Sequence, residues 1–421
     1  MELLAVVVIL AVILVIAVSK VMSIIEDSKK ATLESTAKMI ASAAEKVKVQ
    51  NIVLGNTDEI TCESVAKINE VDYKICRIEF DEKNAKVTLI GSGKFDGLNI
   101  CNGSKTSSIV SNKGCGVPYG VGVTYIKDLL ADEETLQNGL TQTTVTVNNQ
   151  LVNAGIRYTG SNPSNKVYFN CEAKDKNNVS YGETGYLYNE SCEIWRIIGV
   201  FDVKSSESET EKTAQRIKIV RDALDTLIAW DTIDSDGGYV NQWGETTLVN
   251  SEKYPGPSLM QYLNGDTEGN YYSLSSIAKS QISDALWNIG ALEYVAEITP
   301  EQAYHEEKGE ETGFGETINY TAKWVGKIGL IYPSNYGYAG EGCTNVRVKD
   351  CGKQNWMNID KYYWLLSPCA LNGIDSWVIN TEGRVTYSNV YNNQLVRPTL
   401  YLSSNVKIIG GNGNTEPFKL K

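Results

Sequence analysis

The first fifty residues decide how the rest of the chain can be arranged. Residues 1–20 read MELLAVVVILAVILVIAVSK and residues 21–50 read VMSIIEDSKKATLESTAKMIASAAEKVKVQ. The first glycine of the chain is Gly55 and the first proline is Pro118, so no helix-breaking residue interrupts this stretch. The sequence therefore predicts one helix of about 50 residues, roughly 75 Å long at 1.5 Å per residue. Such a helix needs a partner along its whole length.

The predicted helix changes character halfway. Residues 3–18 are apolar on every side, whereas after Lys20 charged and small residues alternate with an apolar stripe made of Ile24, Ile25, Ala31, Ala37, Ile40, Ala44 and Val47. A segment that is apolar all round must be buried in lipid or among copies of itself. We therefore assign assembly contacts to Leu3, Leu4, Val8, Leu10, Leu14 and Val18.

Glu2 stands directly before this apolar run. It is either a first-turn acid favoured by the helix dipole, or an assembly charge that pairs with a cation on the next subunit. An unpaired carboxylate is costly in a membrane or in a dry helix bundle, and the family resemblance described next favours the second interpretation.

The start of the chain, MELLAV followed by an aliphatic run, resembles the mature N-terminus of type IV pilins and pseudopilins. The resemblance implies a leader removed by a prepilin peptidase, an N-methylated first residue upstream of Met1, and Glu2 as the assembly glutamate. It also implies a membrane anchor before assembly and a filament core afterwards. Many pilins have a proline where this chain has Ser19, so we expect an unbroken helix. A signal peptide fits less well, because the run starts acidic and continues as helix. A plain anchor would be short with sixteen apolar residues.

Composition argues against most enzymes and against nucleic acid. The 421 residues have a net charge of -12 without a basic patch, and the only histidine is His305, in an acidic stretch that we expect to be a loop. No P-loop, dinucleotide fingerprint or zinc spacing is present. We expect no catalytic site and no cofactor. The best metal candidate is a weak calcium site at Asp231, Asp234 and Asp236, since clustered carboxylates beside glycines suit calcium but also form ordinary turns.

Eight of the nine cysteines fall into close sequential pairs, namely Cys62 with Cys76, Cys101 with Cys115, Cys171 with Cys192, and Cys343 with Cys351. Close pairs in a membrane-anchored chain indicate disulfides formed outside the cell. Cys369 is left over, either as a buried thiol or as an alternative partner for Cys343 or Cys351. Sequence alone does not fix the connectivity.

Composition and periodicity divide the chain into an assembly helix at 1–50, a small β head at 51–118, a connector at 119–155 and a large domain at 156–421. In the head, a short helix at 61–70 precedes an alternating strand at 72–80 and a second strand at 86–90, which predict an antiparallel hairpin. The connector contains one helix and the polar, β-prone stretch TQTTVTVNNQLVN.

The large domain contains all eight tryptophans, and its elements predict an α+β fold. We expect strands at 166–171, 192–201, 216–222, 324–332, 362–368 and 395–402, with a hairpin at 376–391 that turns near Glu382 and Gly383. We expect helices at 257–265 and 275–291, the second with Ile282, Ala285, Leu286 and Ile289 on one face and Gly290 as its cap.

The phrases WRIIGVF, KIGLIYPSNYGYA, YWLLSP, SWVINTEGRV and VRPTLYL resemble a C-type-lectin-like fold, in the version related to formylglycine-generating proteins and found on Gram-positive surface proteins. This resemblance covers about 165–410 and implies a fold more than an activity. Copper-binding cysteines occur in that family, but the flanks of Cys343, Cys351 and Cys369 do not match its motif. The aromatic residues are either core or a sugar-stacking platform, and they include Trp230, Trp243, Trp356, Tyr336, Tyr338, Tyr362 and Tyr363.

These observations predict a structural, major subunit of an extracellular type IV pilus or pilus-like filament. Its partners would be copies of itself, the cytoplasmic membrane before assembly, and an ATPase-driven assembly machine. The alternative is a minor pilin or adhesin whose C-terminal domain binds a glycan or host surface. A third interpretation is an isolated, membrane-anchored lectin-like protein.

Overall fold

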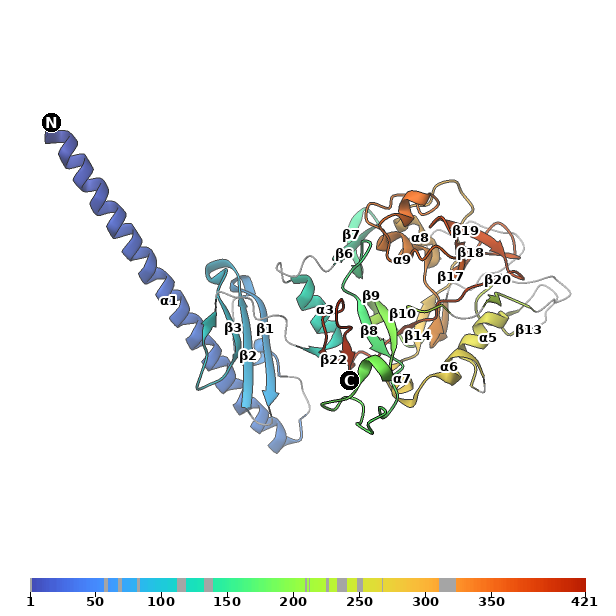
Figure 1. Cartoon of the computed structure of the whole chain (residues 1–421), viewed down its shortest axis with the longest axis horizontal. Helices are drawn as coiled ribbons and strands as arrows, with labels where there is room; N and C mark the ends of the chain where they lie inside the picture. Colours follow the sequence, from blue (N-terminus) through green and yellow to red (C-terminus); the bar gives the residue numbers. More distant parts are fainter. Residues whose placement is uncertain are drawn as a thin grey trace. The chain divides into compact units, whose positions relative to one another are not determined.

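The computed structural model describes residues 2–421 apart from 57–59, 67–69, 82–83, 112–118, 132–138, 209, 212, 225–226, 233–240, 248–252, 267 and 310–322. Within the helices and strands, it leaves out the side chains of residues 2–17, 19, 70, 74, 81, 246 and 247. The chain forms two compact units (Figure 1). The first comprises Met1–Pro118 and Ala131–Glu134, and the second comprises Tyr119–Leu130 and Thr135–Lys421.

The first unit is a long helix with a small sheet packed against its C-terminal half (Figure 1). Helix α1 (Glu2–Leu54) continues for 53 residues without a break, as the lack of glycine and proline predicted. The antiparallel sheet has the order β1-β2-β3-β4, formed by Tyr73–Asp81, Asn84–Gly91, Asn99–Gly103 and Val110–Ser111. The predicted head hairpin is thereby confirmed as β1 and β2. The short helical turns of this unit are α2 (Cys62–Val65), η1 (Glu70–Asp72) and η2 (Gly93–Phe95).

One stripe of α1 forms half of the core of this unit. The side chains that face the sheet are fully buried at a spacing of three to four residues, namely Leu33, Ala37, Ile40, Ala41 and Ala44. They pack against Val87 and Leu89 of β2, Ile100 of β3 and Phe95 of η2. The small alanines let the helix lie close to the sheet, and the predicted Cys62–Cys76 disulfide ties α2 to β1. The β head is therefore fixed to the helix by packing.

The second unit is built around a seven-stranded sheet. Its main path is β16-β21-β10-β9-β7-β6, and β8 pairs with β9. The strands of the main path are β16 (Ile328–Gly329), β21 (Thr399–Tyr401), β10 (Ala214–Arg221), β9 (Glu193–Val203), β7 (Gln150–Tyr158) and β6 (Leu140–Val147), and β8 spans Lys166–Phe169. A three-stranded sheet comprises β17 (Tyr363–Pro368), β18 (Asp375–Ile379) and β19 (Val385–Asn389), and another comprises β23 (Lys419–Leu420), β22 (Lys407–Gly410) and β5 (Gly120–Val121).

Short helices and two-stranded ladders complete the second unit. The helices are α3 (Gly122–Ala131), α4 (Tyr188–Ser191), α5 (Ser258–Asn264), α6 (Gly269–Ser273), α7 (Ser276–Gln281), α8 (Pro300–Glu307), α9 (Pro333–Ala339) and the 3-10 turn η4 (Lys349–Gly352). The ladders pair β11 (Ile228–Ala229) with β20 (Asn393–Gln394), β12 (Thr246–Thr247) with β13 (Lys253–Tyr254), and β14 (Ala285–Asn288) with β15 (Lys323–Gly326). The predicted mixture of helices and antiparallel strands, an α+β chain, is confirmed at this level.

The predicted connector at 119–155 belongs to the second unit. Its polar, threonine-rich part is strand β6, which pairs with β7 at one edge of the seven-stranded sheet. An edge strand buries only one face, so it needs few apolar residues. The boundary that we predicted at residue 156 therefore falls inside β7, and the unit begins at Tyr119 instead.

The helix predicted for 275–291 is wrong beyond Gln281. Helix α7 ends there, and residues 285–288 form β14 with alternating burial. Trp287 decides the outcome, because its buried ring packs on Tyr401 at a centroid distance of 4.9 Å. Gly290 is not a helix cap: a Cβ atom there would lie 2.2 Å from the carbonyl oxygen of Glu306, so close packing requires glycine.

Two predicted irregular segments are helices. His305 lies on α8, where Thr299 forms a capping box with Gln302. The residues PSNYGYA form α9, with Pro333 in the first turn, where the missing N–H costs nothing. The hairpin of β18 and β19 is confirmed, and its turn places Gly383 at a positive φ of 73°.

We expect Ala37→Leu to destabilise the first unit and Ala31→Leu to leave it unchanged. Ala37 is fully buried against the sheet, where a larger side chain overpacks the core at a cost of about 1–3 kcal/mol. Ala31 is exposed on the same helix, so its change stays within about 0.5 kcal/mol. Hydrogen exchange of the β2 amides in the detergent-solubilised full chain measures both. Equal protection in the two variants would contradict this packing.

Candidate assembly surface on the N-terminal helix

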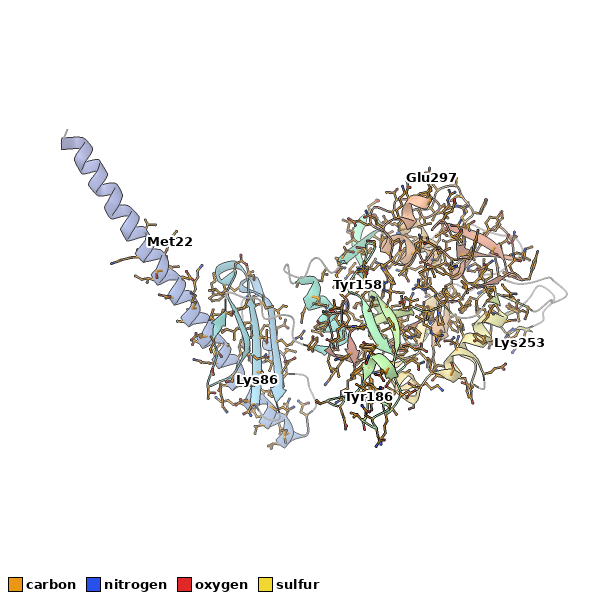
Figure 2. The ribbon with its side chains drawn as sticks, viewed as in Figure 1. Met22, Lys86, Tyr158, Tyr186, Lys253 and Glu297 are labelled. Carbon is orange, nitrogen blue, oxygen red and sulfur yellow. A yellow bond between two sulfur atoms is a disulfide. The ribbon has the colours of Figure 1, made fainter. Side chains whose placement is uncertain are left out.

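The described part of α1 carries a cluster of exposed apolar side chains between residues 18 and 25. Between Val18 and Ile25, the exposed large apolar residues are Val18, Val21, Met22, Ile24 and Ile25. Met22 and Ile24 are 66% and 67% exposed. This part of α1 extends past the sheet of its own unit, as the Met22 label shows (Figure 2). We call these five residues the free face; an exposed apolar cluster of this kind marks an interaction site.

Exposed apolar side chains continue along the part of α1 that carries the sheet. Met39, Val49, Ile52, Val53 and Leu54 are exposed large apolar residues. Met39 lies between the buried residues Ala37 and Ile40, so at 3.6 residues per turn it points to another side of the helix. The sheet therefore covers one side of the helix and leaves others open.

A shallow pocket lies where α1 leaves the sheet. It has a volume of about 500 Å³ and is lined by Met22, Ile25, Glu26 and Lys29 of the helix and by residues 96–98 of the head. Gly97 is one of the lining residues; its φ of +76° favours glycine, and a Cβ atom there would have no neighbour within 4 Å. The pocket joins the free face to the head, so a single partner can contact both.

Two of the charges at this surface are paired within the helix. Glu26 and Lys30 form an ion pair of 2.7 Å one turn apart. The hydrogen bond from Lys30 lowers the pKa of Glu26, and the same bond raises the pKa of Lys30. Exposed pairs of this kind contribute little to stability. The apolar residues beside them therefore dominate what the surface offers to a partner.

Polar contacts hold the helix in a fixed rotation relative to the sheet. Glu45 accepts a 3.2 Å hydrogen bond from the backbone N–H of Ala85 and a 2.6 Å bond from Lys105. Lys48 lies 4.9 Å from the ring centre of Phe80. Because the buried stripe and these contacts fix the rotation, each side chain of the free face has a fixed orientation relative to the sheet.

Of the assembly residues predicted from the sequence, Val18 is exposed and belongs to the free face. Glu2, Leu3, Leu4, Val8, Leu10 and Leu14 lie on α1, but their side chains are outside the described set. Their roles remain predictions. Among the residues that the structure describes, no helix combines the length and the apolar character needed to cross a membrane.

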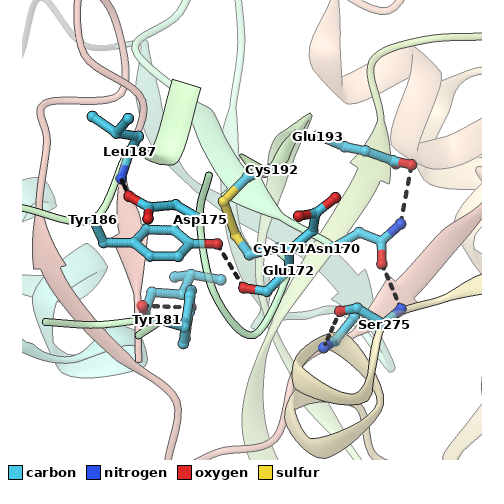
Figure 3. The surroundings of a disulfide bond; sticks show 12 residues. Asn170, Cys171, Glu172, Asp175, Tyr181, Tyr186, Leu187, Cys192, Glu193 and Ser275 are labelled. Atoms are coloured by element: carbon cyan, nitrogen blue, oxygen red, sulfur yellow. Dashed lines mark hydrogen bonds between the residues drawn. A yellow bond between two sulfur atoms is a disulfide. The ribbon is translucent and has the colours of Figure 1, made fainter. Parts of the chain in front are cut away.

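Three predicted disulfides are present. Besides Cys62–Cys76, they are Cys171–Cys192 and Cys343–Cys351. Figure 3 shows the Cys171–Cys192 bridge, next to which the side chain of Asn170 donates to Glu193 and accepts from the N–H of Ser275. Cys115 lies outside the described residues, so its pairing with Cys101 stays a prediction.

Cys369 is a free, buried thiol, which is the first of the two alternatives for it. Burial raises the pKa of this thiol to about 11, so it is protonated and unreactive at neutral pH. It lies in the core around the three-stranded sheet of β17, β18 and β19.

Asp231 is buried and uses its carboxylate to hold neighbouring protein groups. It accepts hydrogen bonds from the hydroxyl of Tyr254 at 2.6 Å and from the N–H and hydroxyl of Ser258 at 3.3 and 3.2 Å. Asp234 and Asp236 lie outside the described residues, so the calcium site stays a prediction. In the described part of the chain, no cluster of three His, Cys, Asp or Glu residues is arranged to hold a metal ion.

Most of the singled-out aromatic residues are core. Trp230, Trp243, Trp356, Tyr336 and Tyr363 are buried. Trp230 packs edge-to-face on Trp243 at a centroid distance of 5.0 Å. Tyr338 is half-buried and Tyr362 is 42% exposed. The packing interpretation is confirmed for the five buried residues, because a sugar cannot stack on a ring that solvent does not reach.

Two features of the structure were not predicted from the sequence. Val21 and Met22 were left out of the predicted stripe, although apolar residues at 21, 22, 24 and 25 already occupy more than one side of a helix. The buried Lys218 was also missed, because RIKIVR reads as a strand with alternate residues in solvent. The strand is central, and residues 216–220 are all buried.

Compared with known proteins, the chain matches no family model, no curated sequence and no solved structure.

We expect Asp231→Ala to destabilise the second unit by about 1–3 kcal/mol, because it leaves buried donors of Tyr254 and Ser258 without an acceptor. Asp231→Asn is the matched control and should lose less, since it keeps one acceptor oxygen. Thermal unfolding with and without EDTA measures both effects, and we expect EDTA to leave the wild-type Tm unchanged. A fall in Tm with EDTA that Asp231→Ala abolishes would instead assign Asp231 to a cation.

Proposed function

We propose that this protein is a structural, major subunit of an extracellular type IV pilus or pilus-like filament, and that it polymerises through α1. The single observation that supports this most is that α1 exposes the apolar free face although another stripe of the same helix is buried against the sheet of the first unit. The resemblance of the first residues to pilins adds the direction of assembly, from the membrane into a filament core.

Burial of the free face supplies the cohesion in this proposal. Covering a large apolar side chain contributes about 1.5–3 kcal/mol relative to leaving it in water. Val21, Met22, Ile24 and Ile25 together therefore favour association strongly. The N-terminal segment, apolar on every side, extends the same contact along the helix.

The distribution of the free face favours a filament over a closed dimer. At 3.6 residues per turn, Ile24 projects on a different side of the helix from Met22. One neighbour cannot cover both sides, so each copy needs several neighbours. Contacts between different surfaces of identical subunits give closed rings when the rotation between copies closes and open helical filaments when it does not.

In this proposal, residues 3–18 hold the precursor in the cytoplasmic membrane. A prepilin peptidase removes its leader, and an ATPase-driven machine then moves the subunit from the membrane into the filament core. The disulfide-bonded second unit would face the exterior. Disulfides such as Cys171–Cys192 and Cys343–Cys351 suit an oxidising, extracellular location.

A second candidate function, a minor pilin or adhesin, is favoured by an exposed aromatic pair on the second unit. Tyr294 and Tyr387 are both partly exposed and meet edge-to-face at 5.1 Å, while Arg347 lies 4.6 Å from the ring centre of Tyr294. Such a pair can stack on a sugar. A glycan array with the full chain in detergent discriminates the two functions: binding lost in Tyr387→Ala supports the adhesin, and absence of binding leaves the structural subunit.

We expect Ile24→Asp to prevent polymerisation, because it places an unpaired charge in a desolvated contact. On removal of detergent, the sedimentable fraction should fall about tenfold or more, since each 1.4 kcal/mol changes an association constant tenfold. Ile109→Asp is the control, because Ile109 is 76% exposed on the head. Equal sedimentation of Ile24→Asp and wild type would argue against the free face as the contact.

We expect Glu2→Ala to impair assembly without changing the head. The proposed role of Glu2 is a charge pair with the next subunit, whereas the head core starts only at Leu33. Filament yield and the hydrogen exchange of β1–β3 are the two measurements. Filaments of normal yield and length from this variant would count against the charge role.

A further inference from the structure

Lys218 is buried in the middle of the second unit. It lies on β10, between β21 and β9 in the seven-stranded sheet, and its relative exposure is 0%. Lysine is almost never buried to this extent without a charged partner. Among the described residues, Lys218 forms no ion pair.

The amine of Lys218 is enclosed by an amide and aromatic rings. Its Nζ donates a 2.8 Å hydrogen bond to Oδ1 of Asn335 on α9, which is also buried. The ring centre of Tyr332 lies 3.9 Å from the Nζ, and those of Trp287 and Tyr401 lie 4.9 and 5.3 Å away. This enclosure excludes water and brings the nitrogen next to the amide group.

The buried carboxyl group of Glu307 lies next to the first turn of α9, the helix that carries Asn335. Glu307, at the end of α8, is 3% exposed and accepts a 2.7 Å hydrogen bond from the N–H of Ser334, the residue before Asn335. Its second oxygen is bonded to the Ser334 hydroxyl. Burial raises the pKa of Glu307 to about 8, so this group holds a proton at neutral pH.

The same burial favours a neutral amine. Desolvation lowers the pKa of Lys218 well below its usual value, and the nearby charge of Arg157 lowers it further, although Glu307 opposes the shift. Arg157 is itself buried, with its guanidinium 4.7 Å from the ring centre of Tyr338. A neutral lysine amine is a nucleophile, whereas the ammonium form is not.

We propose that Lys218 and Asn335 react to form an intramolecular amide bond that joins β10 covalently to α9. The nucleophile (Lys218), the electrophile (Asn335) and the acid (Glu307) are all buried in this part of the second unit. The Lys218 nitrogen contacts the Oδ1 atom that is bonded to the carbon it would attack. Such preorganisation replaces a collision in solution by a step within one molecule.

The reaction balances without an oxidant or a further reactant. The lone pair of the Lys218 Nζ attacks the Cγ of Asn335, and the new N–C bond forms as the Cγ–Nδ2 bond breaks. One proton moves from the attacking nitrogen to the departing nitrogen, so Nδ2 leaves as ammonia. We assign Glu307 as the positioning residue of the cluster, since it holds Ser334 beside Asn335 and keeps a proton in the site.

The bond would enclose far more of the chain than the described disulfides do. Lys218 and Asn335 are 117 positions apart, compared with 14, 21 and 8 for the three cysteine pairs. A cross-link over a longer loop removes more freedom from the unfolded chain. This inference is independent of the filament proposal, because it concerns the second unit alone.

Mass spectrometry of the full chain, purified in detergent and then reduced and denatured, tests the inference. We expect an intact mass lower than calculated by one ammonia molecule, and a tryptic digest with a branched peptide that joins the segments around Lys218 and Asn335. Trypsin should not cleave after Lys218, because its amine is acylated. The full calculated mass, with both residues in linear peptides, would overturn the proposal.

Variants locate the bond and examine the carboxyl group. Lys218→Met and Asn335→Ala should each restore the full calculated mass, whereas Lys361→Met, at an exposed lysine, should keep the ammonia deficit. Glu307→Gln keeps an acceptor for the Ser334 N–H but removes the acidic proton, and we expect it to slow the loss of ammonia. A deficit that persists in Lys218→Met would overturn the assignment. An unchanged rate in Glu307→Gln would overturn the role of Glu307.

Discussion

The structure depends on one constraint, namely that α1 has more apolar surface than its own chain can cover. The helix runs without a break from Glu2 to Leu54, but its buried apolar contacts with the sheet of its unit lie between Leu33 and Ala44. Val21, Met22, Ile24 and Ile25 are left in solvent. Apolar surface of this extent is unfavourable in water, and we propose that lipid or other copies of the chain cover the free face. The filament proposal rests on this exposed surface.

The two units are stabilised by different kinds of interaction. In the first unit, alanines bring the helix close to the sheet and Glu45 fixes its rotation, so the free face is held rigidly. The second unit is held by a large core, by Cys171–Cys192 and by Cys343–Cys351. A covalent link between Lys218 and Asn335 would add a non-reducible closure to the second unit. Such a closure would slow unfolding, which would suit the extracellular location that we propose.

Local sequence rules predicted the elements whose formation depends on local chemistry. The absence of glycine and proline predicted the continuous α1, and the alternation of residues 72–90 predicted β1 and β2. Three of the close cysteine pairs were also predicted correctly. The failures share a cause in tertiary packing. The segment at 285–288 became a strand because Trp287 packs on Tyr401, and the threonine-rich β6 joined the main sheet as an edge strand. The burial of Lys218 depends on strands on both sides of β10, and no local pattern contains that information.

We propose that other copies of the chain cover the free face of α1, and electron cryo-microscopy of the particles that the full chain forms after detergent removal can examine this contact. We expect filaments in which Val21, Met22 and Ile24 contact α1 of neighbouring copies and the helix is continuous through residues 11–19. Single, unassembled molecules, or filaments in which residues 18–25 face solvent, would refute the proposal.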